Sequence, residues 1–264
     1  MRFNGTSSKA ENTTAPVVGI AGAARFSIGL WFRAIDYGGS GSGRLFCLPE
    51  AGALDSTDRG MTCRTNSSTT SLRYNKYHNP NSGTWDIVTA APTARWMFAG
   101  INMDYSVFTD PQHFLIDQNS FDGGRLSTST NVSTPSGTAS QTPAAGICIG
   151  NRSSTGVVDF NGDICHVQIW DGRLLTQAEW NQAAWFPGSV RHRLTSWYPL
   201  INDGRDLARG LNLTLTQCTV GPVPPQLGNP YYRSPILNRY GKAAAGGGGG
   251  STFTPRMALM GVGR

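Results

Sequence analysis

Charged side chains are scarce in this sequence, and acidic ones are the scarcest. Only 14% of the 264 residues are charged, against roughly a quarter in typical soluble domains. Glutamate occurs only at Glu11, Glu50 and Glu179, so the net charge of +6 comes from missing acids and not from a concentrated basic stretch. A nucleic-acid-binding surface needs such a concentration. The sequence therefore predicts no specific nucleic-acid partner, while an acidic partner stays open.

Long apolar runs are also lacking. No segment approaches the roughly 18 apolar residues of a membrane-spanning helix, and residues 1–14 hold no apolar core of a secretion signal. The five cysteines are odd in number and form no C-x-x-C metal knuckle. We therefore expect reduced, buried thiols, synthesis in the cytoplasm without an export signal, and no membrane span.

Turn-forming residues are abundant, with 33 glycines and 15 prolines. Between them lie short segments with a period of two. In residues 25–34, Phe26, Ile28, Leu30 and Phe32 fall on one face while polar residues, glycine and Trp31 fall on the other. This pattern predicts an all-β protein, a two-sheet antiparallel β-sandwich with one short helix and extended terminal arms.

Further strands are predicted at residues 44–48, 60–65, 71–77, 84–89, 94–105, 114–117, 125–129, 146–150, 157–170, 193–200 and 211–216. The helix is predicted at residues 177–185, because Thr176 and Glu179 have capping-box spacing. Residues 130–144, rich in Ser, Thr and Pro, are predicted to form an exposed loop. The predicted organisation is an N-terminal arm (1–19), a sandwich (20–220) and a Pro/Gly-rich linker with a C-terminal docking arm (221–264).

Three segments resemble the laminin-G/concanavalin-like jelly roll in the form found in phage and prophage structural proteins. They are FSIGLWF (26–32), the segment IGNRSSTGVVDFNGDICHVQIWDGRLLTQAEW (149–180), and WYPLINDGRDLARGLNLTL (197–215). The resemblance spans about residues 20–220. It implies the fold, and only weakly a function.

The resemblance also raises glycoside hydrolysis, because some relatives are glycosidases that use two facing carboxylates. The expected E-x-D-x-x-E segment is absent. Asp159 and Asp163 are the one candidate pair, and we interpret them as structural. The four histidines are far apart and no G-x-S-x-G elbow is present. The sequence therefore predicts a protein without a catalytic site.

Two kinds of binding site are weaker predictions. Some relatives bind Ca²⁺ through loop oxygens, for which the candidates are Asp104, Asn151, Asp159, Asn161 and Asp203. No other cofactor is expected. A surface glycan would need aromatic and hydrogen-bonding side chains, and the aromatic candidates are Tyr37, Tyr74, Tyr77, Trp85 and Tyr105.

The last residues add an interaction segment. A run of five glycines precedes the apolar stretch that contains Phe253, Pro255, Met257, Leu259, Met260 and Val262. Such a stretch is expected to dock on the same or a neighbouring subunit. The leading functional hypothesis is a virion structural protein, a capsid decoration (cement) or accessory shell protein located in the virion. Its partners would be other copies of itself and a capsid or tail protein. The alternatives are a glycan-binding module of a tail or fibre and, last, a divergent glycosidase.

Overall fold

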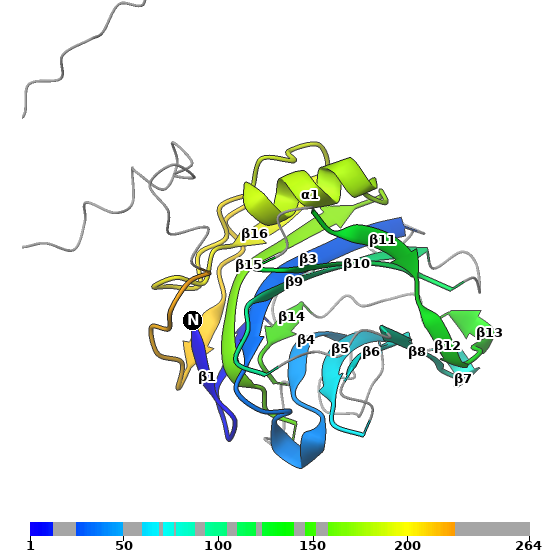
Figure 1. Cartoon of the computed structure of the whole chain (residues 1–264), viewed down its shortest axis with the longest axis horizontal. Helices are drawn as coiled ribbons and strands as arrows, with labels where there is room; N and C mark the ends of the chain where they lie inside the picture. Colours follow the sequence, from blue (N-terminus) through cyan, green and yellow to red (C-terminus); the bar gives the residue numbers. More distant parts are fainter. Residues whose placement is uncertain are drawn as a thin grey trace, which may run out of the picture. The chain divides into compact units, whose positions relative to one another are not determined.

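The computed structural model describes residues 1–12, 25–49, 60–68, 71–76, 78–87, 93–104, 110–119, 123–139, 146–151 and 158–224. These residues form two stacked antiparallel sheets with one α-helix on the outside (Figure 1). The predicted all-β jelly-roll sandwich is confirmed. In the part of the chain that the structure describes, no helix is long and apolar enough to cross a membrane.

The longest strand of the seven-stranded sheet is β15 (Asn161–Asp171), which pairs with three other strands. The strand order of this sheet is β1 (Arg2–Asn4), β15, β3 (Arg25–Ala34), β9 (Met97–Asp104), β10 (Gln112–Asp117) and β11 (Arg125–Thr128), and β16 (Leu194–Tyr198) also pairs with β15.

The eight-stranded sheet lies beneath it. Its order is β12 (Thr130–Ser133), β8 (Gly83–Ile87), β6 (Ser71–Lys76), β5 (Gly60–Asn66), β4 (Arg44–Pro49), β14 (Ile147–Ile149), β2 (Lys9–Asn12) and β17 (Thr214–Thr216). A small third sheet pairs β13 (Ser136–Ala139) with β7 (His78–Asn81), and a 3-10 turn, η1, covers Gly39–Gly41.

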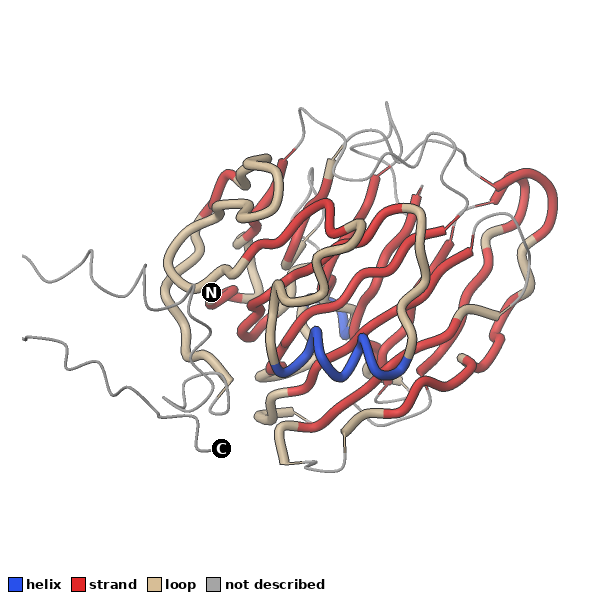
Figure 2. Tube along the Cα trace, turned by 90° about the horizontal axis from the view of Figure 1, so that it is seen from above, coloured by secondary structure: helices blue, strands red, loops and turns tan. Residues whose placement is uncertain are grey.

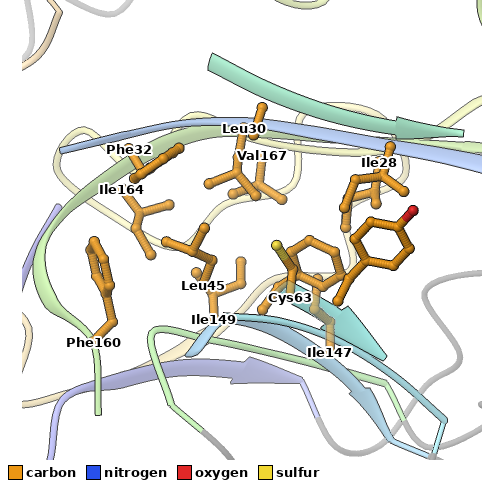
Figure 3. Packing of buried hydrophobic residues seen from close by; sticks show 14 of the residues in the cluster. Ile28, Leu30, Phe32, Leu45, Cys63, Ile147, Ile149, Phe160, Ile164 and Val167 are labelled. Atoms are coloured by element: carbon orange, nitrogen blue, oxygen red, sulfur yellow. The ribbon is translucent and has the colours of Figure 1, made fainter. Parts of the chain in front are cut away.

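The core fills the space between the two large sheets. Ile28, Leu30 and Phe32 of β3 point down toward Leu45 and Ile149 of the opposite sheet (Figure 3), and all five are at most 1% exposed. The period-two pattern is what places them there, because successive strand residues face opposite sides. Burial of this apolar surface is the main force that holds the sheets together.

A second apolar cluster lies on the outer face of the seven-stranded sheet, where the helix α1 (Gln177–Trp185) packs (Figure 2). Trp180 is fully buried there and contacts the rings of Phe98, Phe114 and Trp170, with centroids 5.5 to 6.1 Å apart. The helix begins with the predicted capping box, since Thr176 and Glu179 each bond the other's backbone N–H.

The N-terminal segment corrects the sequence prediction, because its described residues are not an arm. Strand β1 pairs with β15, and β2 lies between β14 and β17. Phe3 and Ala10 are fully buried. These strands are three and four residues long, too short to show a period, and their partners come from distant parts of the chain. Residues 13–19 lie outside the described residues.

The predicted loop at 130–144 also differs. The described residues of this segment, 130–139, contain β12 and β13, which pair with β8 and β7. Side chains on β12 are exposed on both faces, so no hydrophobic alternation marks the strand in the sequence. The backbone of β12 pairs with β8, and Asn131 Nδ2 also donates to Asp110 Oδ1 at 3.2 Å. Of the predicted C-terminal segment, the described residues end at Pro224.

Candidate functional site

The two sheets differ in how their outer faces are used. The helix covers the outer face of the seven-stranded sheet, whereas the outer face of the eight-stranded sheet carries polar side chains. Six residues there occupy consecutive cross-strand positions from β2 to β8, and we call them the polar row: Glu11, Cys148, Cys47, Thr62, Asn75 and Thr84. At about 4.8 Å between neighbouring strands, the row spans roughly 24 Å.

Strand alternation explains why these side chains share a face. In β5, Met61 and Cys63 belong to the core between the sheets, so Thr62 points outward. In β6, Leu72 and Tyr74 belong to the core, so Asn75 points outward. The register of the sheet then sets Thr62 directly opposite Asn75.

Three buried oxygens of the polar row lack a hydrogen-bond donor among the described residues: Glu11 Oε2, Thr62 Oγ1 and Asn75 Oδ1. The other polar atoms of Glu11 and Asn75 do have partners. Lys9 pairs with Glu11 Oε1 at 2.7 Å, and Asn75 Nδ2 donates to Thr84 Oγ1 at 2.8 Å. Buried polar atoms in native proteins nearly always have partners. Two of the three oxygens only accept, so a ligand that donates hydroxyl groups complements them.

The middle of the row consists of two thiols. Cys47 and Cys148 lie opposite each other on β4 and β14 and are 8% and 1% exposed. Burial raises the pKa of the Cys148 thiol well above its ordinary value, so this side chain stays a neutral thiol. None of the five cysteines forms a disulfide bond in the structure. The Cys148 position of the row is therefore uncharged.

A second line of side chains runs beside the polar row. Arg44, Arg64, Arg73 and Asp86 occupy successive positions on β4, β5, β6 and β8. Arg73 binds Asp86 through two bonds of 2.7 and 2.8 Å, which raise the pKa of the guanidinium. This pair borders the Asn75 end of the row, where the side chains are half-buried.

Two of the aromatic glycan candidates, Tyr74 and Trp85, are not on this face. Tyr74 and Trp85 are 0% and 1% exposed and stack on each other inside the core, with ring centroids 5.6 Å apart. Their prediction as ligand-binding side chains is wrong. Alternate residues of a strand face opposite sides of the sheet, and Tyr74 and Trp85 are on the side that faces the core. Tyr37 is half-buried. Tyr77 and Tyr105 lie outside the described residues.

The proposed calcium ligands do not converge on one point. Asp104 forms an ion pair with Arg25, and Asp203 forms one with Arg205. Each carboxylate is thus engaged locally. Across the described parts of the chain, no group of three or more His, Cys, Asp or Glu side chains is close enough to hold a metal ion.

The other three candidates lie along one segment but serve different contacts. Asn151 donates to Asp159, and both side chains are buried. Asn161 donates to Asp36 at 2.6 Å. Burial raises the pKa of Asp159. These contacts brace the loop that leads into β15.

Asp159 and Asp163 do not form a catalytic pair. Asp163 is fully buried and accepts four hydrogen bonds of 2.6 to 3.0 Å from the guanidinium groups of Arg2 and Arg33. A carboxylate held by two guanidinium groups in this way anchors the strands around it. The sequence interpretation of the pair as structural agrees with these contacts.

Sequence reasoning missed the residues of the polar row. A signal was present, since Thr62 and Asn75 sit at the polar positions of strands whose alternate residues are apolar. Glu11 lay in the segment that we interpreted as an arm. The apolar C-terminal candidates, from Phe253 to Val262, lie outside the described residues.

Comparisons with known proteins concern the fold alone. No family model matches the chain, and no curated protein matches it in sequence. A heptameric SAP-like pentraxin from Limulus polyphemus is similar over 69% of this chain and 80% of its own, with 12% identity and a TM-score of 0.46. A putative carbohydrate-binding protein from Bacteroides ovatus matches 84% of this chain and 62% of its own, with 13% identity and a TM-score of 0.48.

The CBM40 domain of the Ruminococcus gnavus IT-sialidase, solved with α2,3-sialyllactose, matches 69% of this chain and 94% of its own. It has 11% identity and a TM-score of 0.45. The two antiparallel sheets and the single helix of this chain agree with the predicted β-sandwich.

Proposed function

We propose that this protein is a non-catalytic binding module that holds a glycan on the outer face of its eight-stranded sheet. One observation carries the proposal: three buried oxygens of Glu11, Thr62 and Asn75 lie in one cross-strand row and have no donor among the described residues. Sugar hydroxyl groups are donors and match these acceptors. At the β6–β8 end of the row, Asn75 and Thr84 are half-buried, and a glycan would enter there.

The row supports binding better than hydrolysis. Glycoside cleavage needs two carboxyl groups on either side of the bond. The polar row contains a single carboxylate, Glu11, which pairs with Lys9. A bound glycan would therefore remain intact.

A glycan array followed by calorimetric titration of the best ligand tests the proposal. Thr62→Val and Asn75→Leu remove two of the three oxygens and are expected to weaken binding about tenfold or more each, since one hydrogen bond to a buried partner is worth roughly 1–3 kcal/mol. Thr219→Val is the matched control, because Thr219 is exposed and lies outside the row. An array without a hit, or equal loss in the control, would exclude this site.

A role as a virion structural protein is a second proposal. Its support is in the sequence, where an apolar segment follows a run of five glycines. A flexible linker of this kind lets an apolar segment reach a neighbouring subunit. In this proposal the protein is a capsid decoration or accessory shell subunit. If the protein were part of a tail or fibre, it could both bind a glycan and be a structural component of the virion.

A further inference from the structure

The segment that follows helix α1 displays an unusual set of exposed side chains. Residues 186–193, which we call the return segment, run from the end of the helix to the start of β16. Phe186 is 45% exposed, an uncommon state for a large aromatic ring among the described residues. Arg191, His192 and Arg193 follow in succession, and all three are exposed.

The backbone beneath these side chains is held firmly. Gln168 Oε1 accepts from Gly188 N at 2.7 Å, and Trp170 Nε1 donates to Val190 O at 2.8 Å. Both side chains that anchor the segment are fully buried. The return segment is thus tied to β15 from within the fold.

The backbone of residues 191–193, at the end of the return segment, is also held by hydrogen bonds. Asp171 N donates to Arg193 O at 3.0 Å, and Arg173 donates to His192 O at 3.2 Å. Arg193 has a φ of 61°, a left-handed conformation that costs energy for a residue with a side chain. Arg191 lies over the ring of Trp197, 6.0 Å from its centroid. The fold therefore fixes the backbone that carries both arginines, and the Trp197 ring positions the guanidinium group of Arg191.

Their positive charge is not balanced within the described residues. Arg25, Arg33, Arg73 and Arg173 each have a carboxylate partner, whereas no described carboxylate pairs with Arg191 or Arg193. A segment with an exposed aromatic ring and two arginines has the composition of protein–protein hot spots. Because its backbone is fixed beforehand, binding costs no ordering of the main chain.

We infer that the return segment, with Phe186, Arg191 and Arg193, docks on an acidic surface of another protein that offers an apolar pocket for the phenyl ring. Arginine forms two parallel bonds with a carboxylate, which suits Asp and Glu side chains. A second copy of this chain fits poorly, because its net charge is +6. The segment adjoins the helix on the seven-stranded sheet, whereas the polar row belongs to the other sheet, so this inference does not depend on glycan binding.

The test uses the full chain and a fluorescein-labelled peptide of glutamate and leucine, with fluorescence anisotropy as the readout. The Arg191→Gln/Arg193→Gln double variant is expected to weaken binding roughly tenfold, the factor for the loss of two surface charge pairs. Phe186→Ala should weaken binding of this peptide but not of a peptide of glutamate alone. Arg125→Gln is the control, since Arg125 is an exposed arginine on β11.

Each other outcome overturns the inference. If Arg125→Gln reduces the affinity as much as the double variant, the attraction is unspecific. If dextran sulfate binds as tightly as the peptide and Phe186→Ala changes neither, the segment is a polysaccharide-binding surface. The three side chains are exposed, so the variants should fold like the parent chain, and circular dichroism of each variant verifies this.

Discussion

Gly29 and Gly100 lie directly opposite each other on β3 and β9, and the indole of Trp180 fills the space above both. A Cβ atom at Gly29 would lie 2.6 Å from Trp180, and one at Gly100 would lie 2.8 Å from it. The helix can therefore pack on this sheet only where two neighbouring strands lack side chains.

Gly100→Ala is expected to lower the free energy of unfolding by about 1–3 kcal/mol, because the methyl group overpacks the cluster. Without a clash, alanine would stabilise a strand relative to glycine. A decrease in the free energy of unfolding would therefore show that the new methyl group collides with Trp180. Urea unfolding measures it. In a Trp180→Leu background the same substitution should cost much less; an equal cost would show that the ring is not the obstacle.

Asp163→Asn is expected to destabilise the fold by about 2–4 kcal/mol, because it removes a fully buried charge that two arginines bind. Asp203→Asn provides the comparison, since its ion pair with Arg205 is largely exposed and is worth less than about 1 kcal/mol. Thermal and urea unfolding of both variants separates a buried anchor from a surface pair. Equal effects would contradict the structural role of Asp163.

Thr62→Val should raise stability while it weakens glycan binding. The substitution removes a buried hydroxyl group that has no partner among the described residues, and an apolar group of the same shape stabilises by up to about 1 kcal/mol. Unfolding and titration on the same protein give both values. A loss of stability would mean that the hydroxyl is bonded in the free protein, and the polar row would lose its main support.

The stability of the protein should fall as the pH drops from about 6.5 toward 4. Burial lowers the pKa of His78 and of His113 to about 4 and that of His166 to about 3, whereas the ordinary value is 6.5. The unfolded chain therefore binds more protons in this range, so acid favours unfolding. Each histidine contributes up to about 1.4 kcal/mol per pH unit.

His113→Gln tests this dependence, because His113 bonds Ser129 at 2.8 Å and glutamine can keep a polar contact there. The variant should show a shallower decline of stability between pH 6.5 and 4.5, measured by urea unfolding. His192→Gln, at an exposed position, should leave the slope as it is. A slope that does not respond to His113→Gln would assign acid sensitivity to other groups.

Deletion of residues 246–264 tests the virion proposal. The shortened chain should fold, because these residues follow the described sandwich, but it should no longer co-sediment with particles or form oligomers. Analytical ultracentrifugation of both chains measures this. Unchanged association after deletion would remove the C-terminal segment from the proposal.

The sequence by itself determined the two-layer β architecture, the helix and its cap. Period-two patterns such as that of β3, and the Thr176–Glu179 spacing, are local signals with a direct physical meaning. Tertiary structure decided the rest. It placed Phe3 and Ala10 in the core through partners far along the chain. It also turned Tyr74 and Trp85 inward and aligned Thr62 with Asn75, because strand register depends on pairing between segments that no local pattern specifies.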